Sequence, residues 1–183
     1  DESEKISLLH KLGNHFTDSQ KDSSYFYYDQ AIRVAKENDL QSLLGKSLAN
    51  KGVTASIHRN YELSDSLYEE ALKIYKLLKV KNSRIVNTYV NLLINQMGNA
   101  NVEKAQMFFD SASVYVQKDD LKSQFKVNDI MHYLLSRQER HEDSLAYAQR
   151  NYKLVKETDM VPQIASALMA LATSFSNLDN IDS

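Results

Sequence analysis

The sequence repeats itself with a period of about 40 residues, and this repeat limits the possible fold more than any other feature. One column of equivalent positions recurs at almost constant spacing and contains Gly13, Gly52, Leu93, His132 and Ala172. Two further columns keep the same period: Ser24, Ser64, Ala105 and Ser144, and then Ala31, Ala71, Ala112 and Asn151. A fixed period of this length is typical of chains built from stacked structural units.

Each unit is predicted to be a pair of α-helices. Apolar residues recur at helical spacing, and no alternating strand pattern competes with them. The chain of 183 residues contains only 4 Gly and 1 Pro, so we expect tight turns to be scarce and the fold class to be all-α. The helices are expected over residues 3–17, 22–37, 40–58, 62–79, 83–97, 101–117, 120–137, 142–157 and 161–176.

The repeat is clearest over residues 48–75, LANKGVTASIHRNYELSDSLYEEALKIY. Gly52 and Ser64 are small enough for two antiparallel helices to approach closely, while Tyr68 and Ala71 shape the contact with the next pair. This pattern resembles the tetratricopeptide (TPR) signature, and the resemblance covers essentially the whole chain. It implies a right-handed α-solenoid of antiparallel helix pairs, a TPR superhelix. The single array would contain approximate repeats at 1–38, 39–81, 82–119 and 120–158 and a half repeat at 159–183.

The array departs from the family pattern in its period, its joints and its end. The period is longer than the roughly 34 residues usual for TPR proteins, and the long repeats are similar in style to arrays of bacterial signalling proteins. Leu93 and His132 replace the small residue of the first column, and Asn151 replaces Ala in the third, so we expect wider or distorted joints there. The half repeat lacks a polar capping helix, so we expect an exposed apolar face at the C-terminal end. That face would pair with a second copy or continue into further repeats of a longer chain.

Composition excludes several classes of partner for this region. The net charge of −2 gives no electrostatic footprint for a nucleic acid. The sequence has no apolar run long enough for membrane insertion, and it contains no Cys for disulfide chemistry. Cytoplasmic and periplasmic locations are both compatible with these features.

Catalytic motifs are also missing from the sequence. None of the five His residues has a second His at zinc-protease spacing, and the Gly-Lys-Ser at 45–47 lacks the earlier Gly of a phosphate-binding loop. No nucleophile elbow or Gly-rich dinucleotide loop is present. We therefore expect that the chain is not an enzyme and has no cofactor or metal site.

The resemblance implies that the first helix of each pair lines a concave groove. Counting from the Gly52 column, the predicted partner-binding residues are His10, Asn14, Lys46, Val53, Ile57, Asn87, Asn91, Ile94, Met97, Lys126, Tyr133 and Arg137. An apolar centre surrounded by amides and cations suits an extended or helical segment of a protein or peptide ligand. The alternative that Val53, Ile57, Ile94 and Met97 pack in the core remains open.

Three functions fit this sequence. The first is a non-enzymatic scaffold that binds a protein or peptide segment in the concave groove. The second is a ligand-sensing regulatory region attached to a kinase or DNA-binding output domain of a bacterial signalling protein. The third is an oligomerisation module that forms a homo-oligomer through its uncapped C-terminal end. The carboxylate clamp of some TPR proteins lacks its leading Lys here, so a chaperone C-terminus is not predicted as the ligand.

Overall fold

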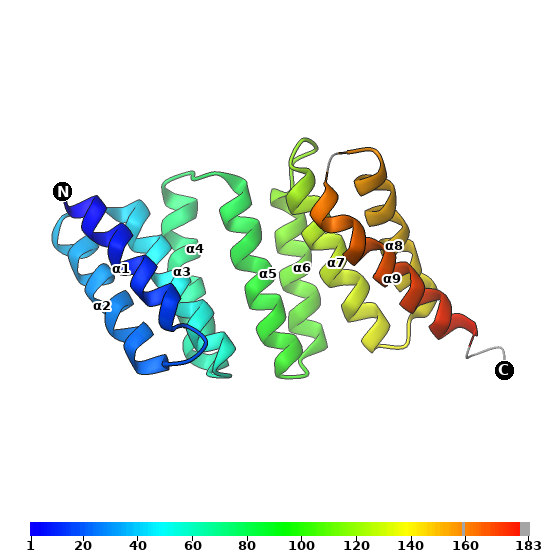
Figure 1. Cartoon of the computed structure of the whole chain (residues 1–183), viewed down its shortest axis with the longest axis horizontal. Helices are drawn as coiled ribbons and strands as arrows, with labels where there is room; N and C mark the ends of the chain where they lie inside the picture. Colours follow the sequence, from blue (N-terminus) through cyan, green and yellow to red (C-terminus); the bar gives the residue numbers. More distant parts are fainter. Residues whose placement is uncertain (159, 180–183) are drawn as a thin grey trace. The chain divides into compact units, whose positions relative to one another are not determined.

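A computed structural model describes residues 1–158 and 160–179 of the chain (Figure 1). These residues form nine α-helices and no β-strand, which confirms the all-α prediction. Each expected helix begins and ends within three residues of an observed one. The helices are α1 (Glu2–Phe16), α2 (Lys21–Glu37), α3 (Gln41–Ile57), α4 (Tyr61–Leu77), α5 (Asn82–Gly98), α6 (Val102–Tyr115), α7 (Leu121–Arg137), α8 (His141–Lys156) and α9 (Val161–Asp179).

The chain divides into two compact units, Asp1–Tyr115 and Val116–Ser183. In the first unit each helix packs against the next one in the chain, and α3 also contacts both α1 and α5. Helices α1, α3 and α5 therefore lie side by side in one layer. In the second unit α7, α8 and α9 pack consecutively, and α7 also contacts α9. Both units thus have the consecutive helix packing of a helical-repeat protein.

The predicted half repeat, residues 159–183, is described over residues 160–179. There it contributes the single helix α9, while residues 159 and 180–183 lie outside the described part of the chain. No helix among the described residues combines the length and the apolar character that a membrane crossing requires.

Aromatic rings lie directly against the helix backbone at Gly13 and Gly52, the two glycines of the first column. A Cβ atom on Gly52 would lie 2.8 Å from Cε1 of Tyr68, and one on Gly13 would lie 2.7 Å from Cζ of Tyr28. Both Tyr rings are almost fully buried. Only glycine leaves room for such a contact, so the Tyr28 and Tyr68 rings pack on the first helix of their own pair.

In the fourth pair the large and small residues are exchanged. His132 takes the Gly52 position and is buried. Ala148 follows His132 at the same sequence offset at which Tyr68 follows Gly52, and it is fully buried. Ala148 thus takes the place that Tyr68 has in the second pair, and its small side chain compensates for the larger His132. The expectation that this joint is wider stays a prediction.

In the second and fourth pairs, the small residue that opens the second helix is a serine that also donates a hydrogen bond. The hydroxyl group of Ser64 donates to the backbone carbonyl of Gly52 at 2.8 Å, and that of Ser144 donates to the carbonyl of His132 at 3.0 Å. Serine at this position therefore allows close approach and at the same time satisfies its own buried hydroxyl group.

A completely buried amide, Asn95, connects three helices of the first unit. Its Nδ2 atom donates to Ser64 Oγ at 2.8 Å and to Asp65 Oδ1 at 2.7 Å, and its Oδ1 atom accepts from Ser56 Oγ at 2.6 Å. Gln96 Nε2 donates to the second oxygen of Asp65 at 2.6 Å. Because buried polar groups stabilise a fold only when they are partnered, this network fixes the register of α5 against α3 and α4.

Five helices end on a residue in the left-handed region although none of these residues is glycine. They have φ angles between 49° and 61°, and they are Asp39, Arg59, Lys79, Ala100 and Glu139. At the end of α7, the N–H of Arg140 donates to the Leu135 carbonyl at 3.0 Å, and that of Glu139 donates to the Ser136 carbonyl at 3.1 Å. This is the Schellman pattern. The expectation that tight turns are scarce is therefore wrong, because hydrogen bonds hold other residues in the conformation that glycine usually takes.

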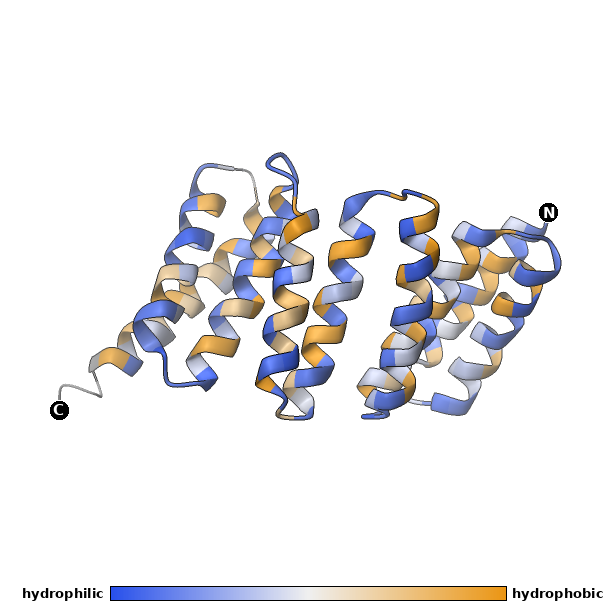
Figure 2. Ribbon diagram, turned by 180° about the vertical axis from the view of Figure 1, so that it is seen from behind, coloured by the Kyte–Doolittle hydropathy of each residue, from blue (hydrophilic) through white to orange (hydrophobic). Residues whose placement is uncertain are grey.

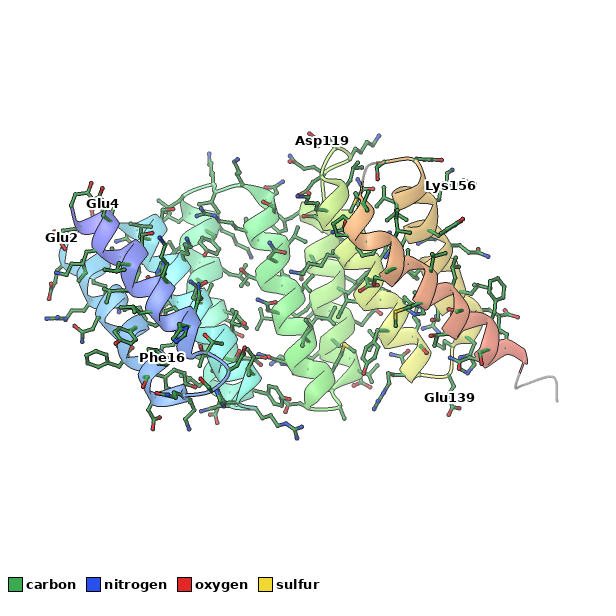
Figure 3. The ribbon with its side chains drawn as sticks, viewed as in Figure 1. Glu2, Glu4, Phe16, Asp119, Glu139 and Lys156 are labelled. Carbon is green, nitrogen blue, oxygen red and sulfur yellow. The ribbon has the colours of Figure 1, made fainter. Side chains whose placement is uncertain are left out.

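Replacing Glu139 with Gly should raise the free energy of unfolding by about 0.5–1 kcal/mol, because glycine adopts the left-handed conformation without steric cost. Glu139 lies at the exposed turn between α7 and α8 (Figure 3). Urea denaturation measures the change. The matched control is Gln149→Gly at an exposed interior position of α8, which should lower stability by about 1 kcal/mol. A loss of stability in Glu139→Gly would contradict the prediction.

Candidate functional site

The predicted partner-binding residues fall into both units. Those of the first unit lie on α1, α3 and α5, and those of the second lie on α7. Figure 3 shows the side chains of both units as sticks.

Three apolar side chains are exposed at the centre of the layer formed by α1, α3 and α5. The exposed fractions are 36% for Val53, 49% for Ile57 and 40% for Ile94. Val53 and Ile94 occupy equivalent positions on α3 and α5, which contact one another, and Ile57 follows Val53 by one turn. The alternative that these three side chains pack in the core is therefore wrong. Met97 is half-buried, so its exposure fits a place in the groove as well as a place in the core.

Polar side chains accompany this apolar centre on the same helices. Asn14 of α1 is exposed, and its Oδ1 atom accepts a hydrogen bond from the Tyr28 hydroxyl at 2.6 Å. That bond holds the side chain through its oxygen, so the amide nitrogen is the atom that a ligand carbonyl would meet. Lys46 and Asn87 are exposed two turns before Val53 and Ile94. We call this surface the α1/α3/α5 face and define it by Asn14, Lys46, Val53, Ile57, Asn87 and Ile94.

His10 does not belong to the α1/α3/α5 face, and its assignment as a partner-binding residue is wrong. Its side chain is only 4% exposed, and its Nε2 atom lies 2.7 Å from Ser47 Oγ on α3. The ring is therefore directed towards the neighbouring helix rather than towards solvent. Burial, with a smaller contribution from the charge of Lys46, lowers the His10 pKa from 6.5 to about 4.

The repeat spacing shows that Ser7, and not His10, is the residue of α1 at the predicted position. Ser7 of α1 is equivalent to Lys46 and Asn87, because all three precede the first column by the same offset, and it is exposed. His10 precedes Gly13 by only three residues and so points in a different direction. Asn91, two residues before Leu93, is half-buried and is therefore not included in the α1/α3/α5 face.

In the second unit, Lys126, Tyr133 and Arg137 form an exposed stripe on α7. They are seven and four residues apart, so they lie on one side of the helix. The structure thus leaves all three accessible, and their role in binding stays a prediction. Among the described residues, no group of three His, Asp or Glu side chains is arranged to hold a metal ion.

No family model and no curated protein matches the sequence. Among solved structures, 51 chains match it. One of them is the crystal structure of BtubC (BKLC) from P. vanneervenii, with a TM-score of 0.80 and 15% sequence identity. The match covers 98% of this chain and 74% of that chain. At this identity the likeness shows the fold alone, an all-helical, repeat-like arrangement.

The comparison corrects the prediction that the chain is not an enzyme. That prediction depended on missing sequence motifs. The likeness to BtubC (BKLC) is one of fold at 15% identity, and one fold carries unrelated activities in different proteins. Missing motifs on such a fold do not exclude catalysis, so the prediction does not stand.

Proposed function

We propose that this chain is a TPR-type α-solenoid that binds a segment of another protein across the α1/α3/α5 face. The regular repeat period and the glycine–tyrosine contacts support the TPR assignment. The observation that carries the binding proposal is the exposure of Val53 and Ile94 at equivalent positions on adjacent helices, with the exposed Ile57 one turn after Val53. Each apolar side chain gains roughly 1 kcal/mol when a ligand completes its burial, so the three together supply part of the affinity of a specific complex.

The chemistry of the face favours a segment that crosses the helices with an apolar residue at every third position. Packed helices are about 8–10 Å apart. In the polyproline II conformation, side chains on one side of a segment repeat every three residues, or about 9 Å. Such a segment could place successive apolar side chains on Val53 and Ile94, while the Asn14 amide contacts its backbone.

Affinity for selected peptides tests this proposal. Peptides that bind the wild-type chain are first selected from a displayed random library, and their dissociation constants are then measured by fluorescence anisotropy. Ile94→Lys should weaken binding at least about tenfold, because it places an unpaired charge against the apolar side chains of the ligand. The selected peptides should contain apolar residues three positions apart.

The control is Leu77→Lys, an exchange of the same type at the exposed end of α4, outside the α1/α3/α5 face. It should leave the affinity unchanged. Circular dichroism must show the same helix content in both variants, which is expected because both positions are exposed. If Ile94→Lys binds the selected peptides as tightly as the wild type does, the binding site lies elsewhere and the proposal fails.

A further inference from the structure

The acidic residues of the first unit lie mainly in α2, α4 and α6. Each of these helices contains at least two Asp or Glu residues, whereas α3 and α5 contain none. The two acidic residues of α1 are already paired, Glu2 with Lys5 at 3.5 Å and Glu4 with the N-terminal amine at 3.1 Å. Figure 2 shows hydrophilic residues along the helices of this unit, but those of α1, α3 and α5 include no unpaired acidic side chain.

Three exposed cations of these helices lie on the side of the α1/α3/α5 face. Lys46 belongs to the face itself. Lys11 precedes Asn14 by one turn of α1, and Arg84 precedes Asn87 by one turn of α5, so both lie beside residues of the face. Among the described residues, no carboxylate forms an ion pair with any of these three cations. Their positive charges are therefore unbalanced within the fold.

Lys46 and Arg84 lie at the same edge of the face. Arg84 Nη1 donates a hydrogen bond to Ser42 Oγ of α3 at 3.3 Å, and Lys46 follows Ser42 by one turn. The other cation of α3, Lys51, is neutralised, because its Nζ atom lies 2.6 Å from Asp29 Oδ1 of α2. The fold thus supplies a carboxylate for Lys51 and leaves the two positive charges on the N-terminal halves of α3 and α5 without one.

The exposed apolar side chains lie towards the other end of the same two helices. Val53 follows Lys46 by seven residues, or about 10 Å along α3, and Ile94 follows Arg84 by ten residues, or about 15 Å along α5. A segment that crosses the helices therefore lies between an apolar edge and a cationic edge. In the polyproline II conformation the side chains point in three directions, so one row can lie on the apolar edge and the next row towards the cations.

We propose that the segment bound by the α1/α3/α5 face is acidic as well as apolar, and that a Glu or Asp side chain between its apolar residues pairs with Lys46. This inference rests on the function proposed above and specifies the charge of the ligand. Complementary charges guide association and select among partners, so the face prefers an acidic segment to a neutral or basic one with the same apolar residues. Arg84 and Lys11 add to the positive potential that the segment meets.

The peptides selected on the wild-type chain test this preference when they are synthesised with amidated C-termini, so that side chains supply their only carboxylates. They should contain Glu or Asp at one of the two positions between their apolar residues more often than the unselected library does. Lys46→Glu should weaken their binding about tenfold at about 20 mM salt, because it turns an attraction into a repulsion, and high salt should reduce this loss. Fluorescence anisotropy measures the dissociation constants.

A charge exchange and a matched control identify the pair. Replacing the acidic residue of the peptide with Lys should restore binding to Lys46→Glu and weaken binding to the wild type. Lys73→Glu on α4 makes the same change in net charge at an exposed lysine outside the face, and it should leave the affinity unchanged. Circular dichroism should show the same helix content in both variants, since both lysines are exposed.

The outcomes distinguish this inference from the proposed function. The inference alone is overturned if Ile94→Lys weakens binding but the selected peptides show no acidic preference. It is also overturned alone if Ile94→Lys weakens binding but the peptides bind Lys46→Glu and Lys73→Glu with equal affinity. If Ile94→Lys leaves the affinity unchanged, the proposed function fails and this inference fails with it.

Discussion

Replacing Gly52 with Ala should lower the free energy of unfolding by about 2 kcal/mol, even though Ala is the stronger helix former. In an unconstrained helix the exchange would gain about 1 kcal/mol. Here the added Cβ atom would lie 2.8 Å from Cε1 and 3.2 Å from Cζ of Tyr68. The Tyr68 ring is 1% exposed and cannot move without opening its packing. Overpacking of about 3 kcal/mol therefore exceeds the propensity gain. Urea denaturation of the two proteins measures the difference.

Gly98→Ala is the control, because it creates a short contact with a side chain that can move away, whereas Gly52→Ala creates one with a buried ring. A Cβ atom there would come still closer to an aromatic side chain, at 2.5 Å from Tyr61 Oη and Cζ. Gly98 is exposed and Tyr61 is half-buried, so the phenol tip can rotate away, and stability should change by less than about 0.5 kcal/mol. An equal loss in Gly52→Ala and Gly98→Ala would contradict the argument.

A double-mutant cycle with Tyr68→Ala identifies the contact that is responsible. If the ring causes the strain, the loss from Gly52→Ala should disappear once Tyr68 is Ala, giving a coupling energy of about 2–3 kcal/mol. The chain already uses this combination in its fourth pair, where His132 and Ala148 exchange the large and small positions.

The helices and their close contacts were predictable because both follow from periodicity. A stripe of apolar residues at helical spacing determines the helix and its buried side, and a column containing Gly13 and Gly52 predicts where backbones approach. The turns were not predictable in the same way. Asp39, Arg59 and Glu139 adopt the left-handed conformation without being glycine, since the Schellman hydrogen bonds offset the steric cost of the side chain. A low glycine content therefore says little about turns between helices.

The candidate face was predicted in outline, and the errors of that prediction concern polar side chains. Val53 and Ile94 are exposed because the repeat places them on the outer side of α3 and α5, which counting from Gly52 identifies. His10 was predicted to bind but is buried against α3. Asn95 of α5, which was not among the predicted residues, is also polar and completely buried. Its hydrogen-bond partners lie on α3 and α4, far from it in the sequence, so local pattern cannot reveal them. Burial of a polar group depends on which side chains of other helices it meets, and the repeat period does not identify the hydrogen-bond partners of a single residue such as Asn95.

Lowering the pH from 7.5 to 4 should remove about 3 kcal/mol of stability through His10 alone. The Ser47 hydroxyl donates to the Leu43 carbonyl at 2.8 Å, so at 2.7 Å it accepts from His10 Nε2–H. The neutral tautomer therefore leaves Nδ1 without a proton, and this buried nitrogen has no hydrogen-bond partner among the described residues. Protonation would place a charge there without an acceptor and near Lys46, and burial together with that charge lowers the folded-state pKa to about 4.

The direction of the effect follows from the two pKa values of His10. Above pH 6.5 the ring is neutral in both states and the full stability is present. Between pH 6.5 and about 4 only the unfolded chain takes up the proton, so each pH unit lost there costs the folded state about 1.4 kcal/mol. Below about pH 4 both states are protonated and the loss stops.

The comparison variant for this prediction is His10→Gln, which can still reach Ser47 but does not titrate. Subtracting its free energy of unfolding from that of the wild type at each pH cancels the carboxylates common to both proteins. A difference that falls by about 3 kcal/mol across this window supports a buried neutral His10, whereas a constant difference means that the ring is accessible to protons in the folded chain.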